Sequence, residues 1–115
     1  MQRDLLLLGE MIDAAEQIQR LAAGVSLDEI DERRERRDAL LWNYTVLGEA
    51  AGQVSDETKA RFPAVAWQQP VRLRNRIVHG YWSIDMEVLF ATARRQLPAL
   101  AADLRDAFAA LSSYT

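Results

Sequence analysis

The chain has 115 residues, of which 50% are hydrophobic and 27% are charged, values typical of a single globular domain over residues 1–115. No apolar run reaches the roughly 20 residues of a membrane-spanning helix and no signal-peptide pattern occurs, so we expect a soluble, cytoplasmic protein without a membrane partner. Cysteine is absent and histidine occurs once, which excludes disulfides and thiolate chemistry and predicts no metal site and no cofactor.

The formal charge of −3 is unevenly distributed along the chain. No acidic residue lies between Glu57 and Asp85, so this stretch carries a charge of +5 and the remainder carries −8. Such asymmetry would direct an anionic ligand to one face of a molecule that otherwise repels it. The basic residues of the stretch are Lys59, Arg61, Arg72, Arg74 and Arg76.

A first helix is predicted over residues 4–23, because apolar residues recur there at spacings of three and four. Gly24 is expected to end this helix. Ser26 and Glu29 then form a capping-box pattern, which predicts a short helix over residues 27–32.

A second long helix is predicted over residues 34–54, where an apolar stripe continues. The charges over residues 32–38 change sign repeatedly, and we interpret them as an exposed, salt-bridged helix face in preference to an RNA-binding surface. A short helix over residues 57–61 should stop before Pro63, and Trp67 is expected to pack there as an anchor.

The mixed pattern over residues 67–78 is compatible with a third helix that Gly80 terminates. Asp85 is a good N-cap for a last helix, whose apolar stripe extends to Leu111 and which Pro98 should kink. Since no alternating β-branched run occurs, the predicted fold is all-α, an antiparallel up-and-down helical bundle.

The chemistry of the chain is concentrated in residues 72–82, where the only histidine, His79, lies among three arginines and beside a tyrosine. RNA cleavage without a metal needs a base for the 2′-hydroxyl proton, an acid for the leaving oxygen and positive donors for the phosphate. Histidine titrates near neutrality and arginine can hold a phosphate with two parallel hydrogen bonds. The segment therefore indicates ribonuclease chemistry.

Helix geometry limits how one chain could combine Arg74 with His79. Five positions on a helix correspond to about 140° of rotation, so these two side chains diverge, whereas Asn75 and His79 align. Either the chain unwinds before Gly80, or a second subunit completes the site. A two-fold axis would bring two copies of each side chain to one cleft, and we therefore predict a homodimer.

Structural explanations compete with these functional ones. His79 could simply complement the dipole at a helix end, and the arginines could be solvated and paired with acids of the first helix such as Glu10 and Glu16. Tyr81 and Trp82 could be buried core residues, because aromatic side chains dominate cores.

The order of Arg74, Asn75, His79 and Tyr81 resembles the signature of the HepT family of HEPN-domain proteins, in which arginine, a polar residue, histidine and tyrosine follow at these spacings. The likeness covers about residues 37–111, and the first helix shares only its amphipathic character. Further similar segments are residues 47–51, 62–63, 84–85 and 97–98.

The resemblance implies an all-α HEPN bundle that acts as the toxin of a toxin-antitoxin pair by cleaving RNA. His79 would be the acid and base, Arg74 would stabilise the charge on the reacting phosphate, and Asn75 would orient the reacting groups. A minimal nucleotidyltransferase antitoxin would neutralise the toxin by transferring AMP to Tyr81, since added charge and bulk would exclude RNA. The candidate RNA-binding residues are Arg72 and Arg76.

A different class of function also fits the same residues. The protein could be a non-catalytic helical adaptor that binds a nucleotidyltransferase or a nucleotide through its basic face. An adaptor needs positive charge but no titrating group, so its binding would survive the substitution His79→Ala.

Overall fold

The computed structural model describes residues 2–113, and this part of the chain is helical without any strand. The molecule is elongated, with principal extents of 46 × 29 × 20 Å. None of its helices combines the length and the apolar character that crossing a membrane requires. The elements are α1 (Gln2–Ala22), α2 (Leu27–Glu32), α3 (Arg34–Gln53), α4 (Asp56–Arg61), α5 (Gln68–His79), the 3₁₀ turn η1 (Tyr81–Ser83), α6 (Met86–Arg95) and α7 (Leu97–Ser112).

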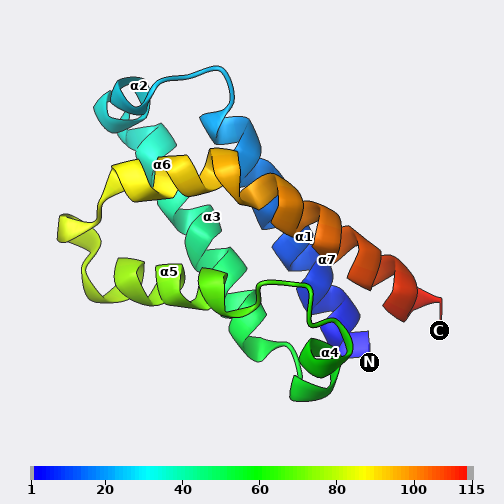
Figure 1. Cartoon of the computed structure of the whole chain (residues 1–115). Coiled ribbons are helices and arrows are strands. Elements are labelled where there is room, and N and C mark those ends of the chain that lie inside the picture. Colours follow the sequence, from blue (N-terminus) through cyan, green and yellow to red (C-terminus); the bar gives the residue numbers. More distant parts are fainter. Residues whose placement is uncertain (1, 114–115) are drawn as a thin grey trace.

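The long helix α1 lies at the centre of the bundle, where it packs against α3 on one side and against α7 on the other (Figure 1). Both neighbours run antiparallel to α1, so the predicted all-α antiparallel bundle is confirmed. The helix α5 packs against α3 and lies across it, at the edge of the bundle. The residues predicted to carry the chemistry therefore lie on an edge helix.

The core is formed by the apolar stripes that the sequence predicted. Tyr44 of α3 is fully buried, and its hydroxyl donates a 2.6 Å hydrogen bond to the carbonyl oxygen of Leu89 in α6. Burial raises the pKa of this phenol. Phe108 departs from the predicted stripe, because 36% of its surface is exposed. Fully buried members of the stripes include Leu8, Ile18, Leu40, Leu97 and Leu104.

The first half of the chain has helix ends close to those predicted. Gly24 follows α1 with a φ of 69°, a left-handed conformation that favours glycine. The Ser26 hydroxyl accepts a hydrogen bond from the Glu29 backbone N–H at 3.2 Å, which confirms the predicted cap of α2. Trp67 is buried, and its indole N–H donates to the carbonyl oxygen of Phe62 at 3.0 Å.

A buried carboxylate joins α1 to the start of α4. Asp4 accepts hydrogen bonds from the Ser55 hydroxyl at 2.6 Å and from the Thr58 hydroxyl at 2.6 Å, and the Ser55 backbone N–H adds a third at 3.1 Å. Burial opposes the ionisation of Asp4, but these three hydrogen bonds outweigh it and lower the pKa of its carboxyl group. The contact fixes the loop that leads from α3 towards α5.

The end of the chain differs from the single kinked helix that the sequence predicted. Asp85 caps α6 as expected, and its carboxylate accepts from the Glu87 backbone N–H at 3.0 Å. However, α6 ends at Arg95 and a separate helix, α7, begins at Leu97. Inside a continuous helix, a proline lacks the N–H for the backbone hydrogen bond and its ring would clash with the preceding turn. Pro98 therefore fits the first turn of a new helix.

The helices α3 and α5 approach each other closely at Gly48. A Cβ atom at this position would collide with the Cβ atom of Arg74 and with the carbonyl oxygen of Pro70. Only glycine allows this approach, and the absence of a side chain at Gly48 brings the stem of Arg74 directly onto α3.

Candidate functional site

The helix α5 continues without interruption through His79, and Gly80 follows its last residue. Of the two alternatives left open by helix geometry, the one in which the chain unwinds before Gly80 to bring His79 towards Arg74 is therefore wrong. Because the backbone stays helical over this segment, Arg74 and His79 point in different directions, whereas Asn75 and His79 are both exposed and lie one turn apart.

Arg74 points towards α3, where it contacts Glu49. Its Nη2 lies 3.1 Å from Oε2 of Glu49, and its Nη1 donates to Oδ1 of Asn75 at 3.1 Å. The Nε atom is buried and has no hydrogen-bond partner among residues 2–113. About a third of the side chain remains exposed, with an exposed fraction of 31%. The guanidinium is thus held on one side and accessible on the other.

The sequence alternative in which the motif arginines pair with acids of the first helix is not observed among the described residues. Glu16 of α1 instead contacts Arg20 and Arg105, at 3.4 Å and 3.3 Å. From its sequence context, mid-helix before two alanines, Glu49 could support the site or bind a partner, but that context favours an ordinary capped or solvated glutamate. Only the packing of α3 on α5 brings Glu49 to Arg74, since the two residues are 25 positions apart.

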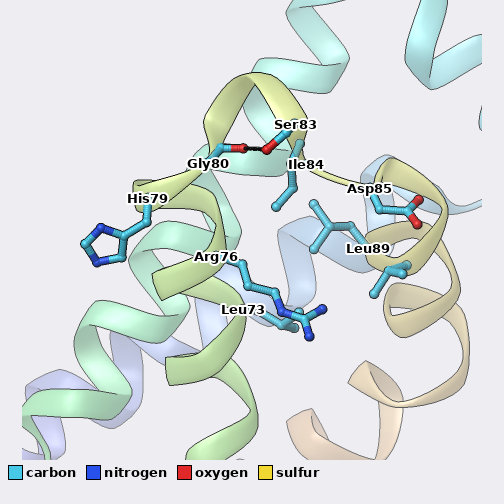
Figure 2. A pocket seen from close by; sticks show the side chains of 9 residues that line it. Leu73, Arg76, His79, Gly80, Ser83, Ile84, Asp85 and Leu89 are labelled. Carbon is cyan, nitrogen blue, oxygen red and sulfur yellow. Dashed lines mark hydrogen bonds between the residues drawn. The ribbon is translucent and has the colours of Figure 1, made fainter.

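His79 lines a hollow of about 330 Å³ between α5, η1 and α6. Figure 2 shows Arg76 extending into this hollow, whereas the imidazole of His79 is turned outward at its edge. The His79 side chain is exposed and makes no hydrogen bond or ion pair with another described residue. Asp85, the cap of α6, lies on the opposite wall.

Tyr81 lies in η1 on the other side of α5 and closes a hollow of about 430 Å³ against α3. Its hydroxyl donates a 2.8 Å hydrogen bond to Oδ1 of Asp38, and this bond raises the pKa of the Tyr81 phenol. The guanidinium of Arg37 lies 5.8 Å from the centre of the ring, and Arg34 contacts Asp38 at 3.5 Å. Part of the predicted ion pairing at the start of α3 is therefore present, in the pair of Arg34 with Asp38 and in that of Arg37 with Asp31 at 3.9 Å.

The aromatic residues after His79 are not core residues. Tyr81 is 41% exposed and Trp82 is 88% exposed, so the alternative of burial is wrong for both. Trp42 of α3 and Val78 of α5 are also exposed, at 66% and 48%. Trp42 and Val78 line the same hollow as Tyr81, so exposed apolar side chains lie beside the motif tyrosine.

One chain does not bring the two central side chains into one hollow. Arg74 lines a hollow of about 390 Å³ that also contains Glu49 and Trp42, whereas His79 lines the hollow beside α6. The stretch between Glu57 and Asp85 contains no acidic residue, but the fold places two carboxylates of α3 against it. Glu49 lies beside Arg74, and Asp38 lies beside Tyr81. Arg72 and Arg76, by contrast, are exposed.

No group of three or more histidine or carboxylate side chains that could hold a metal ion occurs within residues 2–113. The side chains that the motif contributes are an imidazole, guanidinium groups, an amide and a phenol.

Comparison with known proteins identifies related sequences. A protein-family model described as ribonuclease HepT-like matches residues 11–107, which include the whole of α5 and η1. A protein of Thermococcus cleftensis named "Probable ribonuclease HepT" is 23% identical over 93 residues, which cover 81% of this chain and 84% of the relative. "Putative RNase MJ1380" of Methanocaldococcus jannaschii is 24% identical over 93 residues, covering 81% and 85%. No solved structure matches this chain.

Proposed function

Because this chain belongs to the ribonuclease HepT-like family, we propose that it is a metal-independent endoribonuclease and the toxin of a toxin-antitoxin pair. The observation that carries this proposal is the motif helix itself. Within the matched region, α5 and η1 present Arg74, Asn75, His79 and Tyr81 at an accessible edge of the bundle. Relatives named as ribonucleases support RNA as the substrate.

The proposed reaction is a transesterification within RNA. A neutral imidazole of His79 takes the proton of a 2′-hydroxyl, whose oxygen attacks the neighbouring phosphorus, and a protonated imidazole gives a proton to the departing 5′-oxygen. Arg74 stabilises the charge that grows on the phosphate oxygens, and Asn75 orients the reacting groups. The products are a 2′,3′-cyclic phosphate and a free 5′-hydroxyl. Arg72 and Arg76 hold neighbouring phosphates.

The active form in this proposal is a homodimer. Each chain contributes one imidazole, but the reaction uses a base and an acid, and Arg74 and His79 line separate hollows of one chain. A two-fold axis beside α5 would unite Arg74 of one protomer with His79 of the other. The exposure of Trp42, Val78 and Trp82 supports such an interface, because apolar side chains of this size gain free energy when a partner covers them.

Neutralisation in this proposal occurs at Tyr81, by a nucleotidyltransferase antitoxin that uses ATP. The phenol oxygen attacks the α-phosphorus of ATP, the bond to the β-phosphate breaks, pyrophosphate leaves, and the phenol loses its proton. The exposed side chain of Tyr81 and the hydrogen bond from its hydroxyl to the carboxylate of Asp38 support this route, since Asp38 lies where it can receive that proton. The attached AMP would bring negative charge beside the bound RNA and repel its phosphates.

The decisive experiment compares wild type with His79→Ala on labelled RNA in excess chelator, using protein shown by intact mass to be unmodified. Wild type should cleave and leave cyclic phosphate ends, and His79→Ala should lose about 10²–10⁴-fold in rate, the usual contribution of general acid and base catalysis. Gln68→Ala, at an exposed position on the same helix, is the control. Equal rates for wild type and His79→Ala would refute the role of His79, and a need for added Mg²⁺ would refute metal independence.

The separation of Arg74 from His79 in one chain also favours a second candidate function, a non-catalytic adaptor that binds a nucleotidyltransferase or a nucleotide. This candidate predicts that a confirmed dimer cleaves none of several RNAs. It also predicts that binding to the basic face persists in His79→Ala and is lost when Arg72 and Arg76 are replaced.

A further inference from the structure

We infer that Glu49 is a positioning residue, which holds the guanidinium of Arg74 in the orientation that receives the RNA phosphate. The inference rests on the proposed role of Arg74 in cleavage. Glu49 lies on α3, outside the motif; its side chain is 51% exposed and contacts Arg74 at the surface where α3 packs against α5.

The carboxylate of Glu49 contacts a second side chain besides Arg74. Its Oε2 lies 3.1 Å from Nη2 of Arg74, and its Oε1 accepts a hydrogen bond from Nε2 of Gln53, one helical turn further on, at 3.1 Å. Oε1 of Gln53 in turn accepts from Nη2 of Arg3 at 2.7 Å. This row of four polar side chains connects the start of α1 and the end of α3 with the middle of α5.

The backbone of α3 restricts where the stem of the Arg74 side chain can lie. Gly48 precedes Glu49, and its missing side chain lets the Cβ of Arg74 rest on α3. The Nε atom of Arg74 is buried there without a partner among the described residues, so only the two Nη contacts, to Glu49 and Asn75, orient the end of the guanidinium. Loss of the Glu49 contact would release one of the two.

The pair still leaves donors for a phosphate. A guanidinium carries five N–H groups, and the contacts with Glu49 and Asn75 occupy one on each Nη atom. The exposed 31% of the Arg74 side chain is therefore available to RNA. An arginine that is already oriented loses less conformational freedom when it binds phosphate, and it meets the transition state in the correct geometry.

A competing explanation of the Glu49–Arg74 contact predicts that removing Glu49 improves RNA binding instead of slowing cleavage. If Glu49 merely occupied Arg74 and repelled RNA, its removal would make the site more positive and strengthen RNA binding. If Glu49 positions Arg74, its removal must slow the reaction at saturating RNA. Measuring kcat and KM separately distinguishes the two.

The experiment measures RNA cleavage by dimeric Glu49→Ala, Glu49→Gln and the matched control Glu35→Ala, an exposed glutamate at the start of the same helix. Misplacing a reacting group by about 1 Å can cost about 10²-fold in rate, so we expect Glu49→Ala to lose about tenfold in kcat with KM changed by less than about threefold. Glu49→Gln should stay within about threefold of wild type in kcat, because its amide oxygen can still accept from Nη2. Glu35→Ala should equal wild type.

A second readout is independent of activity. The side-chain Nε–H resonance of Arg74 in a ¹⁵N spectrum should shift or broaden in Glu49→Ala and stay close to its wild-type position in Glu49→Gln. An unchanged resonance in Glu49→Ala would overturn the inference. So would a kcat at or above that of wild type with a lower KM, or an equal loss in Glu49→Gln and Glu49→Ala.

Arg74→Ala separates this inference from the proposed function on which it rests. If Arg74→Ala cleaves RNA like wild type, the catalytic role of Arg74 is wrong. If Arg74→Ala is inactive and Glu49→Ala is fully active, only the inference about Glu49 is wrong.

Discussion

Replacing Gly48 by alanine should force α3 and α5 apart, because the added methyl group would overlap the Cβ of Arg74 and the carbonyl oxygen of Pro70. The carbonyl oxygen belongs to the backbone of α5 and cannot rotate away, so the two helices must shift. Overpacking of this kind costs about 1–3 kcal/mol, whereas alanine gains up to about 1 kcal/mol over glycine within a helix. Since backbone has to move, we expect Gly48→Ala to reduce the free energy of unfolding by about 1–2 kcal/mol.

Gly52 provides a matched control one turn further along α3. A methyl group there would have its nearest neighbour, Cγ2 of Val71, at 4.0 Å, which is ordinary van der Waals contact. Gly52→Ala should therefore stabilise the protein by up to about 1 kcal/mol through helix propensity alone. Urea denaturation of wild type and both variants measures the difference, and RNA cleavage should fall only in Gly48→Ala, whose shift displaces Arg74. Equal stability of the two variants would refute the close approach of α3 and α5.

Three further predictions follow from side-chain contacts. The pKa of the Asp4 carboxyl is lowered in the folded protein, so its stabilising effect is complete above the unfolded pKa and is lost as the pH falls through the folded pKa. Asp4→Asn should therefore reduce the free energy of unfolding, measured by urea denaturation, by about 1–3 kcal/mol at pH 7 and by much less at pH 3. An equal reduction at both pH values would contradict this. Asp38→Ala removes the acceptor of the Tyr81 hydroxyl, so the pKa of that phenol should fall towards its ordinary value in a spectrophotometric titration, with Tyr81→Phe identifying its signal. Arg72→Ala and Arg76→Ala should each reduce the slope of log binding constant against log salt by roughly 0.7 for single-stranded RNA, and unchanged slopes would exclude phosphate contacts.

Most helix ends could be predicted from the sequence to within two residues, because capping side chains and glycines mark them locally. Ser26 and Asp85 cap helices through their own side chains, and Gly24 takes a left-handed conformation that few other residues adopt. The helix period also predicted correctly that Arg74 and His79 diverge. The division of the last helix was missed, because Pro98 is compatible with both a kink and a helix start.

The surroundings of the motif could not be predicted in the same way. Glu49 and Asp38 reach Arg74 and Tyr81 only because α3 packs against α5, and no local pattern specifies which residues of two helices meet. A glycine directly before a glutamate in the middle of a long helix was the available signal, since glycine lowers helix stability and its presence there indicates a packing reason. The homodimer stays a prediction.

The position of α5 at the edge of the bundle has a consequence for how the molecule opens. Its main packing partner is α3, whereas α1 is enclosed by α3 and α7. A helix held mainly on one side can detach without unfolding the remaining core, so α5 should form a separate cooperative unit with a lower opening free energy. Backbone amides of α5 should therefore exchange with deuterium earlier than those of α1, and any partner that covers α5 should slow that exchange selectively.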